Sequence, residues 1–441
     1  MSVSAARFFQ VEGVVLRFIG MWPISERHMN ARAITHTAIN LIILVAATVA
    51  EIAFGIVNID DLPLVCDSFC PSSTKMVTAM KVLLLTARRR RVHKVLQTLR
   101  HLYLAETDAE NIAINARLSH FSRTITLILA TLTSATCCSY VFIPIGKYLW
   151  AKHTGGETLR ELPFKSVFPY DASQSPVYEI TYIILSYSGY ITAAGIIGMD
   201  GLFVGLCLHI SGQFQIIQTN INTLVDREIG VLNCLNFLYS PPAAGQIGQA
   251  ELGCSCARMY RFTLTLAFAA PLLTKRPSQD DSAFTEEQSR HIYHRLSAFV
   301  RRQDDTIKLC EEMVKIFQPN ILMHFLSAAF VICFSSVNLI LSSGLAIFLY
   351  VNYIGAATTQ LFVYSIGGSY ISTSSGEICN SAYFFEWYKS NKDVRRLLLM
   401  LMTRAQRESG VFVPFFQASL ETFATILRTA GSYIALLKTF L

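Results

Sequence analysis

The pattern of apolar and polar positions divides the chain into long hydrophobic stretches separated by more polar ones. About 20 helical residues are needed to cross a bilayer. Seven stretches are long enough, at residues 36–57, 62–86, 124–147, 177–200, 317–342, 345–370 and 412–437. The second is the weakest, because Pro71, Lys75 and Lys81 interrupt it. The pattern predicts an all-α, polytopic membrane protein with seven transmembrane helices.

Composition agrees with a membrane protein and argues against a soluble enzyme. Hydrophobic residues make up 52% of the chain, charged residues 15%, and the mean hydropathy is +0.41. Soluble proteins carry about 25% charged residues. The ten histidines form no catalytic or metal-binding pattern, and the sequence has no glycine-rich phosphate loop. We therefore expect neither catalysis nor a cofactor.

Cysteines and basic runs do not change this interpretation. Cys66 and Cys70 are four residues apart, a spacing that fits a disulfide poorly on a helix, so we expect free thiols. The run from Arg88 to Arg91 follows a membrane crossing directly. Such a run is typical of a topology signal that touches anionic lipid, so membrane lipids are expected partners and nucleic acid is not.

Lysines and arginines are distributed unevenly between the two sets of connections. The N-terminal segment and the connections on its side hold 29 of them, and the opposite side holds 5. Because cytoplasmic loops carry the excess of positive charge, the N-terminus is predicted to be cytoplasmic and the C-terminus extracellular. G-protein-coupled receptors have the reverse orientation. Their Asp-Arg-Tyr and Asn-Pro-x-x-Tyr motifs are also missing at the corresponding places.

The last 31 residues, from Val411 to Leu441, have a mixed character. Five polar residues recur every three or four positions and predict one stripe on a single helix: Gln417, Glu421, Thr425, Arg428 and Ser432. The opposite side is apolar, with Phe412, Phe416, Phe423, Ile426, Ala430 and Ile434. Charged groups at membrane depth are costly, so the stripe must face protein or water. Periodicity alone leaves two interpretations open, a helix buried among its neighbours and a pore lining.

Several connections also have predicted structure. The fourth crossing stays helical in pattern beyond Asp200, and Thr285 with Gln288 predicts a capping box for a helix that leads into the fifth crossing. Residues 378–408 predict two amphipathic helices, whose LLLMLM run packs either on another subunit or on its own. The connection at 148–176 is either a folded lid or an ordinary ordered loop.

Three stretches resemble insect odorant receptors. They are ELPFKSVFPYDASQSPVYEITY at 161–182, EICNSAYFFEWYKSNKDVRRLLLMLMTRAQ at 377–406, and FFQASLETFATILRTAGSYIALLKTF at 415–440, with Ser432-Tyr433 at the family's Ser/Thr-Tyr position. The resemblance implies an odorant-gated, non-selective cation channel with four subunits around one pore. It further implies a tuning subunit that assembles with the olfactory co-receptor as a heterotetramer, in the plasma membrane of a sensory neuron dendrite. Its ligands would be small volatile organic odorants.

The resemblance gives the pore interpretation more weight and assigns roles in the last helix. By position relative to Tyr433, Leu436 would be the hydrophobic gate and Thr439 would line the outer mouth. Gln417, Glu421, Thr425 and Ser432 would line the vestibule, whereas Arg428 is expected to be structural. A gustatory receptor of the same superfamily and a secondary transporter remain alternatives.

A ligand cavity is expected where tyrosine pairs share a helix face. Residues three or four apart lie on the same face of a helix. The candidate lining is Tyr350 and Tyr353, Tyr187 and Tyr190, Ser139 and Phe142, and Met76 and Met80. The alternative for each single tyrosine is packing in a core with its hydroxyl bonded, so the prediction rests on the set and not on one residue.

The chain is expected to have three parts. Residues 1–230 hold the N-terminal segment and the first four crossings with the ligand-binding part, and 285–441 hold the last three crossings, the anchor helices and the pore helix. Residues 231–284 separate them as an atypical cytoplasmic insert, either a lineage-specific loop or translated intron.

Overall fold

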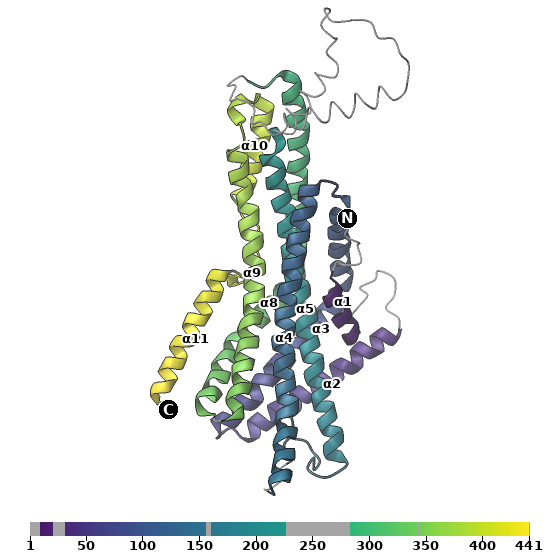
Figure 1. Cartoon of the computed structure of the whole chain (residues 1–441), viewed down its shortest axis with the longest axis vertical. Helices are drawn as coiled ribbons and strands as arrows, with labels where there is room; N and C mark the ends of the chain where they lie inside the picture. Colours follow the sequence, from purple (N-terminus) through teal and green to yellow (C-terminus); the bar gives the residue numbers. More distant parts are fainter. Residues whose placement is uncertain (1–8, 21–30, 156–159, 226–282, 343, 441) are drawn as a thin grey trace, which may run out of the picture. The chain divides into compact units, whose positions relative to one another are not determined.

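The computed structural model describes residues 9–20, 31–155, 160–225, 283–342 and 344–440 (Figure 1). The elements are α1 (Gln10–Ile19), α2 (Ala31–Val57), α3 (Leu62–Ala105), α4 (Ala109–Thr154), α5 (Val177–Asn222), α8 (Glu286–Leu341), α9 (Leu345–Tyr383), η2 (Trp387–Lys389), α10 (Lys392–Ala405), β1 (Phe412–Val413), β2 (Phe416–Gln417) and α11 (Leu420–Phe440). The predicted all-α class is confirmed.

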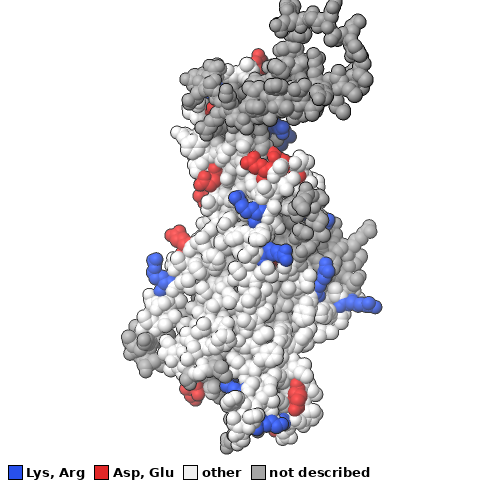
Figure 2. Space-filling view, in the orientation of Figure 1, with Lys and Arg blue, Asp and Glu red and all other residues white. Residues whose placement is uncertain are grey.

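Seven long helices correspond to the seven predicted crossings: α2, α3, α4, α5, α8, α9 and α11. Within the described residues, five of them are long and apolar enough by composition to cross a membrane, namely α2, α4, α5, α8 and α9. Helices α3 and α11 have sufficient length but carry charged residues. A wide stretch of one face of the molecule shows no charged side chain, as expected of a surface in contact with lipid (Figure 2).

The prediction of one helix from Val411 onward is wrong at its start. Residues Phe412–Val413 and Phe416–Gln417 pair as a two-stranded antiparallel hairpin around Pro414, and α11 begins at Leu420. The Ser419 hydroxyl accepts a hydrogen bond from the Thr422 amide at 3.2 Å, which caps the helix and sets its first turn. Gln417 therefore lies on β2 and not on the helical stripe.

Helix α3 is more regular than its sequence suggests, because it runs unbroken through Pro71. Proline lacks the amide proton that would bond the carbonyl one turn earlier. Around it, the hydroxyls of Ser73 and Thr74 both donate to the Cys70 carbonyl, at 2.9 and 3.1 Å. The two lysines do not break the helix either, since each has a buried carboxylate partner.

The predicted extensions of the fourth and fifth crossings are confirmed. Helix α5 continues from Val177 past Asp200 to Asn222. Helix α8 begins with the capping box: the Gln288 amide donates to the Thr285 hydroxyl at 3.2 Å, and the Thr285 amide donates to the Gln288 side chain at 2.9 Å. Two otherwise unbonded amide groups of the first turn are satisfied in this way.

The chain divides into two compact units. Unit 1 comprises Met1–Gln213, Thr306–Ser375 and Ser409–Leu441, and unit 2 comprises Phe214–Asp305 and Gly376–Glu408. Two hydrophobic clusters form the centre of unit 1. One joins α4, α5 and α9 through Leu118, Leu208 and Val363. The other takes in Ala430 of α11, so the last helix packs against the rest of unit 1 through its apolar side.

In unit 2, the two amphipathic helices predicted at 378–408 become the end of α9 and the separate helix α10. The Asn391 side chain accepts from the Val394 amide at 3.0 Å and caps α10. Of the LLLMLM run, Leu398 and Leu401 are buried within the chain, whereas Leu399 and Met400 are exposed. The run therefore has one packed side and one open side. Apart from Ala283 and Phe284, the predicted insert at 231–284 lies outside the described residues.

The part of the α4–α5 loop that the structure describes, from Arg160 onward, is anchored in unit 1. The Phe164 side chain is buried, and the Val167 amide donates to the Ala50 carbonyl of α2 at 3.1 Å. On the exposed side, hydrogen bonds from the Ser173 hydroxyl and amide hold the pKa of Asp171 below its usual value. The described part of this connection is thus a folded segment. Cys66 and Cys70 are free thiols, as expected.

Candidate ligand-binding cavity

A cavity of about 80 Å³ lies inside unit 1, between α3, α4, α5, α8 and α9, with Phe164 of the α4–α5 loop in its wall. Most of its wall consists of small or apolar side chains, such as Val77, Ala193, Ile196, Ala328 and Val331. A single water needs roughly 10–15 Å³ on this measure, so the space holds on the order of six water-sized groups. The cavity therefore has room for a small organic molecule.

One end of the cavity is aromatic. The Tyr140 ring of α4 stacks on Phe164 at a centroid distance of 5.1 Å and meets Tyr353 of α9 edge-on at 5.9 Å. The Tyr353 hydroxyl donates to the Cys70 carbonyl at 2.8 Å and lies 2.7 Å from the Thr74 hydroxyl. Three rings from three separate segments thus form a wall in which Tyr353 is held by α3.

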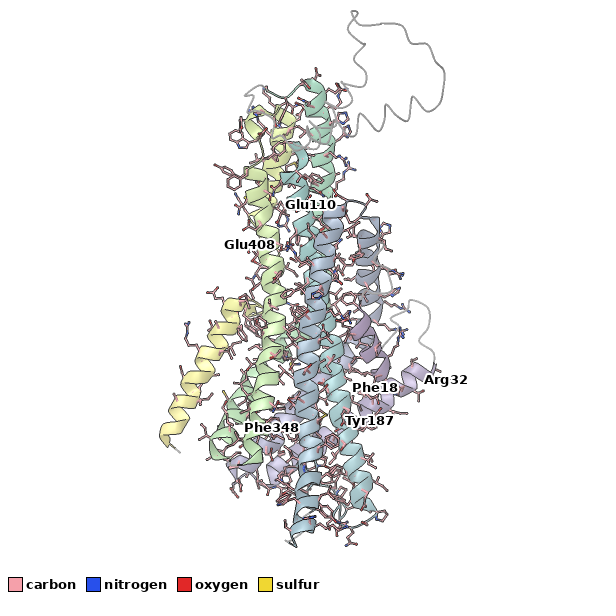
Figure 3. All side chains as sticks on the ribbon, in the orientation of Figure 1. Phe18, Arg32, Glu110, Tyr187, Phe348 and Glu408 are labelled. Atoms are coloured by element: carbon pink, nitrogen blue, oxygen red, sulfur yellow. The ribbon has the colours of Figure 1, made fainter. Side chains whose placement is uncertain are left out.

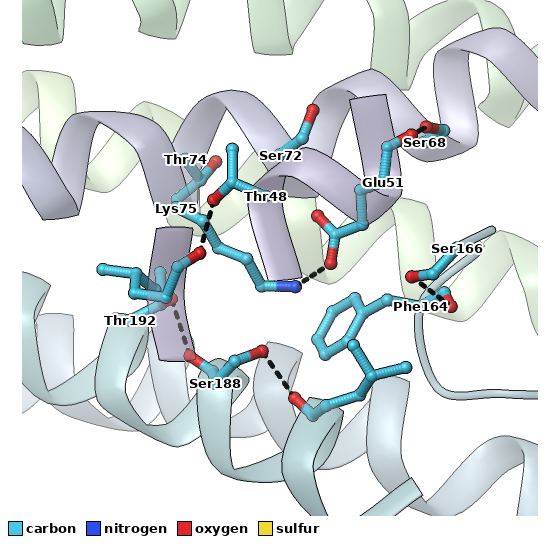
Figure 4. A network of polar contacts seen from close by, with 12 residues as sticks. Thr48, Glu51, Ser68, Ser72, Thr74, Lys75, Phe164, Ser166, Ser188 and Thr192 are labelled. Atoms are coloured by element: carbon cyan, nitrogen blue, oxygen red, sulfur yellow. Dashed lines mark hydrogen bonds and ion pairs between the residues drawn. The ribbon is translucent and has the colours of Figure 1, made fainter. Parts of the chain in front are cut away.

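A buried ion pair lies beside this aromatic end. Lys75 of α3 contacts Glu51 of α2 through its ammonium group, and both side chains are buried. The same ammonium lies 3.4 Å from the centroid of the Phe164 ring, a cation–π contact (Figure 4). Two charges removed from water are tolerated when they pair with each other, and the ring adds a further favourable contact.

The other end of the cavity is polar and has its own ion pair. Lys81 of α3 lies 2.7 Å from Asp200 of α5, and both are buried. The amide of Gln360 and the hydroxyl of Tyr364, both on α9, also donate to Asp200, at 2.5 and 2.6 Å. One carboxylate therefore ties three helices together, and the positive charge of Lys81 is compensated.

Two polar atoms of the cavity wall have no hydrogen-bond partner among the described residues. They are the hydroxyl of Tyr140 at the aromatic end and Nε2 of His324, on α8, at the polar end. The His324 ring stacks on Tyr364 at 4.7 Å, with 30° between the ring planes. A buried polar atom without a partner costs about 1–3 kcal/mol. A molecule that supplies a partner removes that cost.

Of the eight residues predicted as cavity lining, the cavity takes in Tyr353. Four others have exposed side chains: Met76, Met80, Phe142 and Tyr190. Tyr187 donates to Asn40 at 3.0 Å and packs edge-on against Phe18 of α1 (Figure 3). Ser139 donates to the Ala135 carbonyl of its own helix, and Tyr350 donates to Asp67. The cavity is therefore built from neighbouring positions on the same helices.

Most of the predicted lining residues lie outside the cavity for a simple physical reason. Met76 follows Lys75 directly, and successive residues on a helix point about 100° apart. In a membrane protein the large apolar side chains can face lipid, so Met and Phe do not mark the interior. The more useful signal was the pair Lys75 and Lys81 in a membrane segment, because ionisable residues there face the inside of a bundle.

Some of the predicted pore residues lie in the part of the chain that the structure describes, and the side chains of others do not. Glu421, Thr425 and Ser432 lie on α11 with exposed side chains, and Arg428 lies on the same side. On the other side, Ala430 is part of the core of unit 1, and the half-buried Leu427 packs against it. The side chains of Leu436 and Thr439 lie outside the described residues. The stripe predicted for this helix is thus present from Glu421 to Ser432.

Comparison with known proteins agrees with this architecture. The profile of the 7tm odorant receptor family matches residues 61–431. Odorant receptor 22c of Drosophila melanogaster is 31% identical, over 99% of this chain and 98% of its own length. Odorant receptor 10a of the same fly is 27% identical, over 98% and 96%. The structure of olfactory receptor OR5 from Machilis hrabei in complex with eugenol matches with a TM-score of 0.73 at 12% identity, covering 100% and 99% of the two chains.

The helices and the internal cavity together define a polytopic, all-α membrane receptor with space for a small molecule. The chain belongs to the 7tm odorant receptor family of insects. Its relatives are receptors and not enzymes. The family match also favours the odorant receptor interpretation over the gustatory receptor and transporter alternatives.

Proposed function

We propose that the protein is a tuning odorant receptor subunit, in which a small volatile molecule binds in the cavity of unit 1 and opens a non-selective cation channel. The observation that carries this proposal is the cavity itself, because it lies among membrane helices and combines an apolar wall with two unpaired polar atoms. Small-molecule sites commonly have this composition.

The second element of the proposal is the pore. Four subunits, including copies of the olfactory co-receptor, would surround an axis toward which α11 turns Glu421, Thr425 and Ser432. Support comes from the exposure of this stripe in the single chain and from the packing of Leu427 and Ala430 on the opposite side. Leu436 would form a hydrophobic gate that closes by dewetting, with Thr439 at the outer mouth. Gln417, on the hairpin before α11, would lie at the inner entrance.

The proposed orientation places the N-terminus in the cytoplasm of a sensory neuron and the C-terminus outside. The distribution of lysine and arginine supports this arrangement. An epitope tag at each end tests it: in intact cells an antibody should reach the C-terminal tag only. Labelling of the N-terminal tag in intact cells would reverse the topology and remove the proposed place of the gate.

The functional experiment is co-expression with an insect olfactory co-receptor in cells, with current recorded during application of a panel of small volatile compounds. Eugenol belongs in the panel because it is the compound bound to the Machilis receptor. Cells that express the co-receptor alone are the control, and surface labelling confirms delivery. We expect cation currents that need both subunits. A surface-expressed protein that stays silent across a broad panel contradicts the proposal.

A further inference from the structure

The charges that face the cavity already have partners, and this restricts the ligand. Lys75 is paired with Glu51, and Lys81 is paired with Asp200, which also accepts from Gln360. An ionised ligand would therefore enter a site whose charges are balanced, and it would leave its own charge without a counter-ion. Burying an unpaired charge is far more costly than burying a hydrogen-bonding neutral group. The site favours a neutral molecule.

The two ends of the cavity differ in chemistry, so a ligand is oriented. Tyr140, Phe164 and Tyr353 form the aromatic end, and Lys81, His324 and Gln360 line the polar end. On α9 the aromatic end is marked by Tyr353 and the polar end by Gln360, seven residues further on, which is ~10 Å along a helix. Aromatic rings attract one another in stacked and edge-on geometries. The ring of a ligand belongs at the first end and its polar group at the second.

At the polar end, His324 offers the free position. The Gln360 amide and the Lys81 ammonium are each held in place by Asp200, whereas Nε2 of His324 has no partner among the described residues. The imidazole cannot easily turn away to find one, because it is stacked on Tyr364, whose hydroxyl is held by Asp200 at 2.6 Å. The ring is thus fixed in place before a ligand arrives, which lowers the entropy cost of binding.

We infer that the ligand class is a small, neutral aromatic compound with one oxygen group, and that His324 is the residue that selects for the oxygen. The ring lies against Tyr140, Phe164 and Tyr353, and the oxygen forms a hydrogen bond with Nε2 of His324. This inference rests on the proposed function, since it concerns the same cavity. Tyr140 carries the other unpaired polar atom, but its ring belongs to the aromatic end, against Phe164 and Tyr353, so an oxygen bound to its hydroxyl would reverse the orientation of the ligand.

The test compares three probes of nearly equal size: toluene, benzyl alcohol and benzoate. Currents are recorded from cells that express the chain with the co-receptor. We expect benzyl alcohol to act at a concentration at least about tenfold lower than toluene, because it supplies the missing hydrogen bond. Benzoate, which is ionised at neutral pH, should be inactive. Equal potency of toluene and benzyl alcohol, or a response to benzoate as strong as to the alcohol, overturns the inference.

Variants of the two unpaired residues locate the oxygen. His324→Phe keeps a ring that can stack on Tyr364 but removes both nitrogens, so the alcohol should lose its advantage and the two probes should become about equally potent. Tyr140→Phe is the matched control, since it removes only the other unpaired atom. It should leave the ratio of benzyl alcohol potency to toluene potency unchanged. If His324→Phe does not reach the surface, His324→Gln keeps a hydrogen-bonding group and should preserve the preference. If the ratio of the two potencies changes in Tyr140→Phe and not in His324→Phe, the assignment of the oxygen to His324 is overturned.

A binding measurement separates this inference from the proposed function. Ligand-induced thermal stabilisation of the purified full chain does not need a channel to open. We expect a larger rise in melting temperature with benzyl alcohol than with toluene, and loss of the difference in His324→Phe. Stabilisation with that pattern but without any current contradicts the channel proposal and retains the ligand class. Currents that do not depend on the oxygen group of the ligand support the channel proposal and contradict the ligand class.

Discussion

Lys81 on α3 and Asp200 on α5 form a buried ion pair, with 2.7 Å between Nζ and Oδ1. Asp200 also accepts from Gln360 and Tyr364 of α9, so a single carboxylate connects three of the helices that enclose the cavity. Because all four side chains are buried, the network depends on each charge having its partner.

Asp200→Asn should destabilise the protein strongly, since it leaves the Lys81 ammonium buried without a counter-charge. Breaking a buried pair in this way costs about 3–5 kcal/mol. The thermal unfolding midpoint of the purified chain measures the loss. Glu161→Gln is the matched control, because its pair with Lys147 is exposed at 3.3 Å and such pairs contribute about 0–1 kcal/mol. Equal midpoints for Asp200→Asn and wild type would show that Lys81 is stabilised by other means.

The helices could be predicted from the sequence because each depends on local pattern. Periodicity gave the extension of α5 beyond Asp200, and Thr285 with Gln288 gave the start of α8. The start of α11 was missed even though its signals are local: Pro414 interrupts the apolar run, and Ser419 is a good helix cap. The turn and cap residues, and not the apolar run, determine where this helix begins.

The cavity could be predicted only in part, because its lining depends on how the helices rotate against one another. Met76 and Lys75 are neighbours, yet one is exposed and the other lines the cavity. Lipid takes up large apolar side chains, so hydrophobicity does not distinguish the outside of a helix from the inside. Lysines mark the inside of a helix, since an ionisable group in a membrane segment needs a protein partner.

Phe164→Ala should loosen the α4–α5 loop and open the aromatic end of the cavity. The ring is buried against Tyr140 and the Lys75 ammonium, and removal of such a ring costs about 3–5 kcal/mol. We expect a lower unfolding midpoint together with a shift of ligand preference toward bulkier compounds. The control is Trp150→Ala, whose side chain is 73% exposed and whose loss should cost at most about 0.5 kcal/mol. A Phe164→Ala variant as stable as Trp150→Ala would show that the loop is anchored elsewhere.

Thr285→Ala removes one half of the capping box of α8. Loss of a threonine cap costs about 1 kcal/mol of helix stability, so the first turn after Glu286 should fray. Hydrogen exchange of the full chain measures this as faster exchange at residues 286–290 with little change further along α8. Thr131→Ala serves as the control, because its exposed hydroxyl donates only to the Leu127 carbonyl one turn earlier. Unchanged exchange at 286–290 would mean that other contacts hold the start of the helix.

The pore role of α11 makes opposite predictions for its two sides. If four copies meet around a water-filled axis, Thr425→Cys should react in open channels with a small cationic thiol reagent and change the current, since Thr425 is exposed in the single chain. Leu427→Cys should react much less, because Leu427 is half-buried and packs against the core of unit 1 on the opposite side of the helix. Wild type is the background, as the chain has 11 cysteines of its own. Glu421→Gln, which removes a negative charge from the same stripe, should lower the preference for cations. Protection of Thr425→Cys together with reaction of Leu427→Cys would place the opposite side of α11 at the water path and would exclude the stripe as the pore lining.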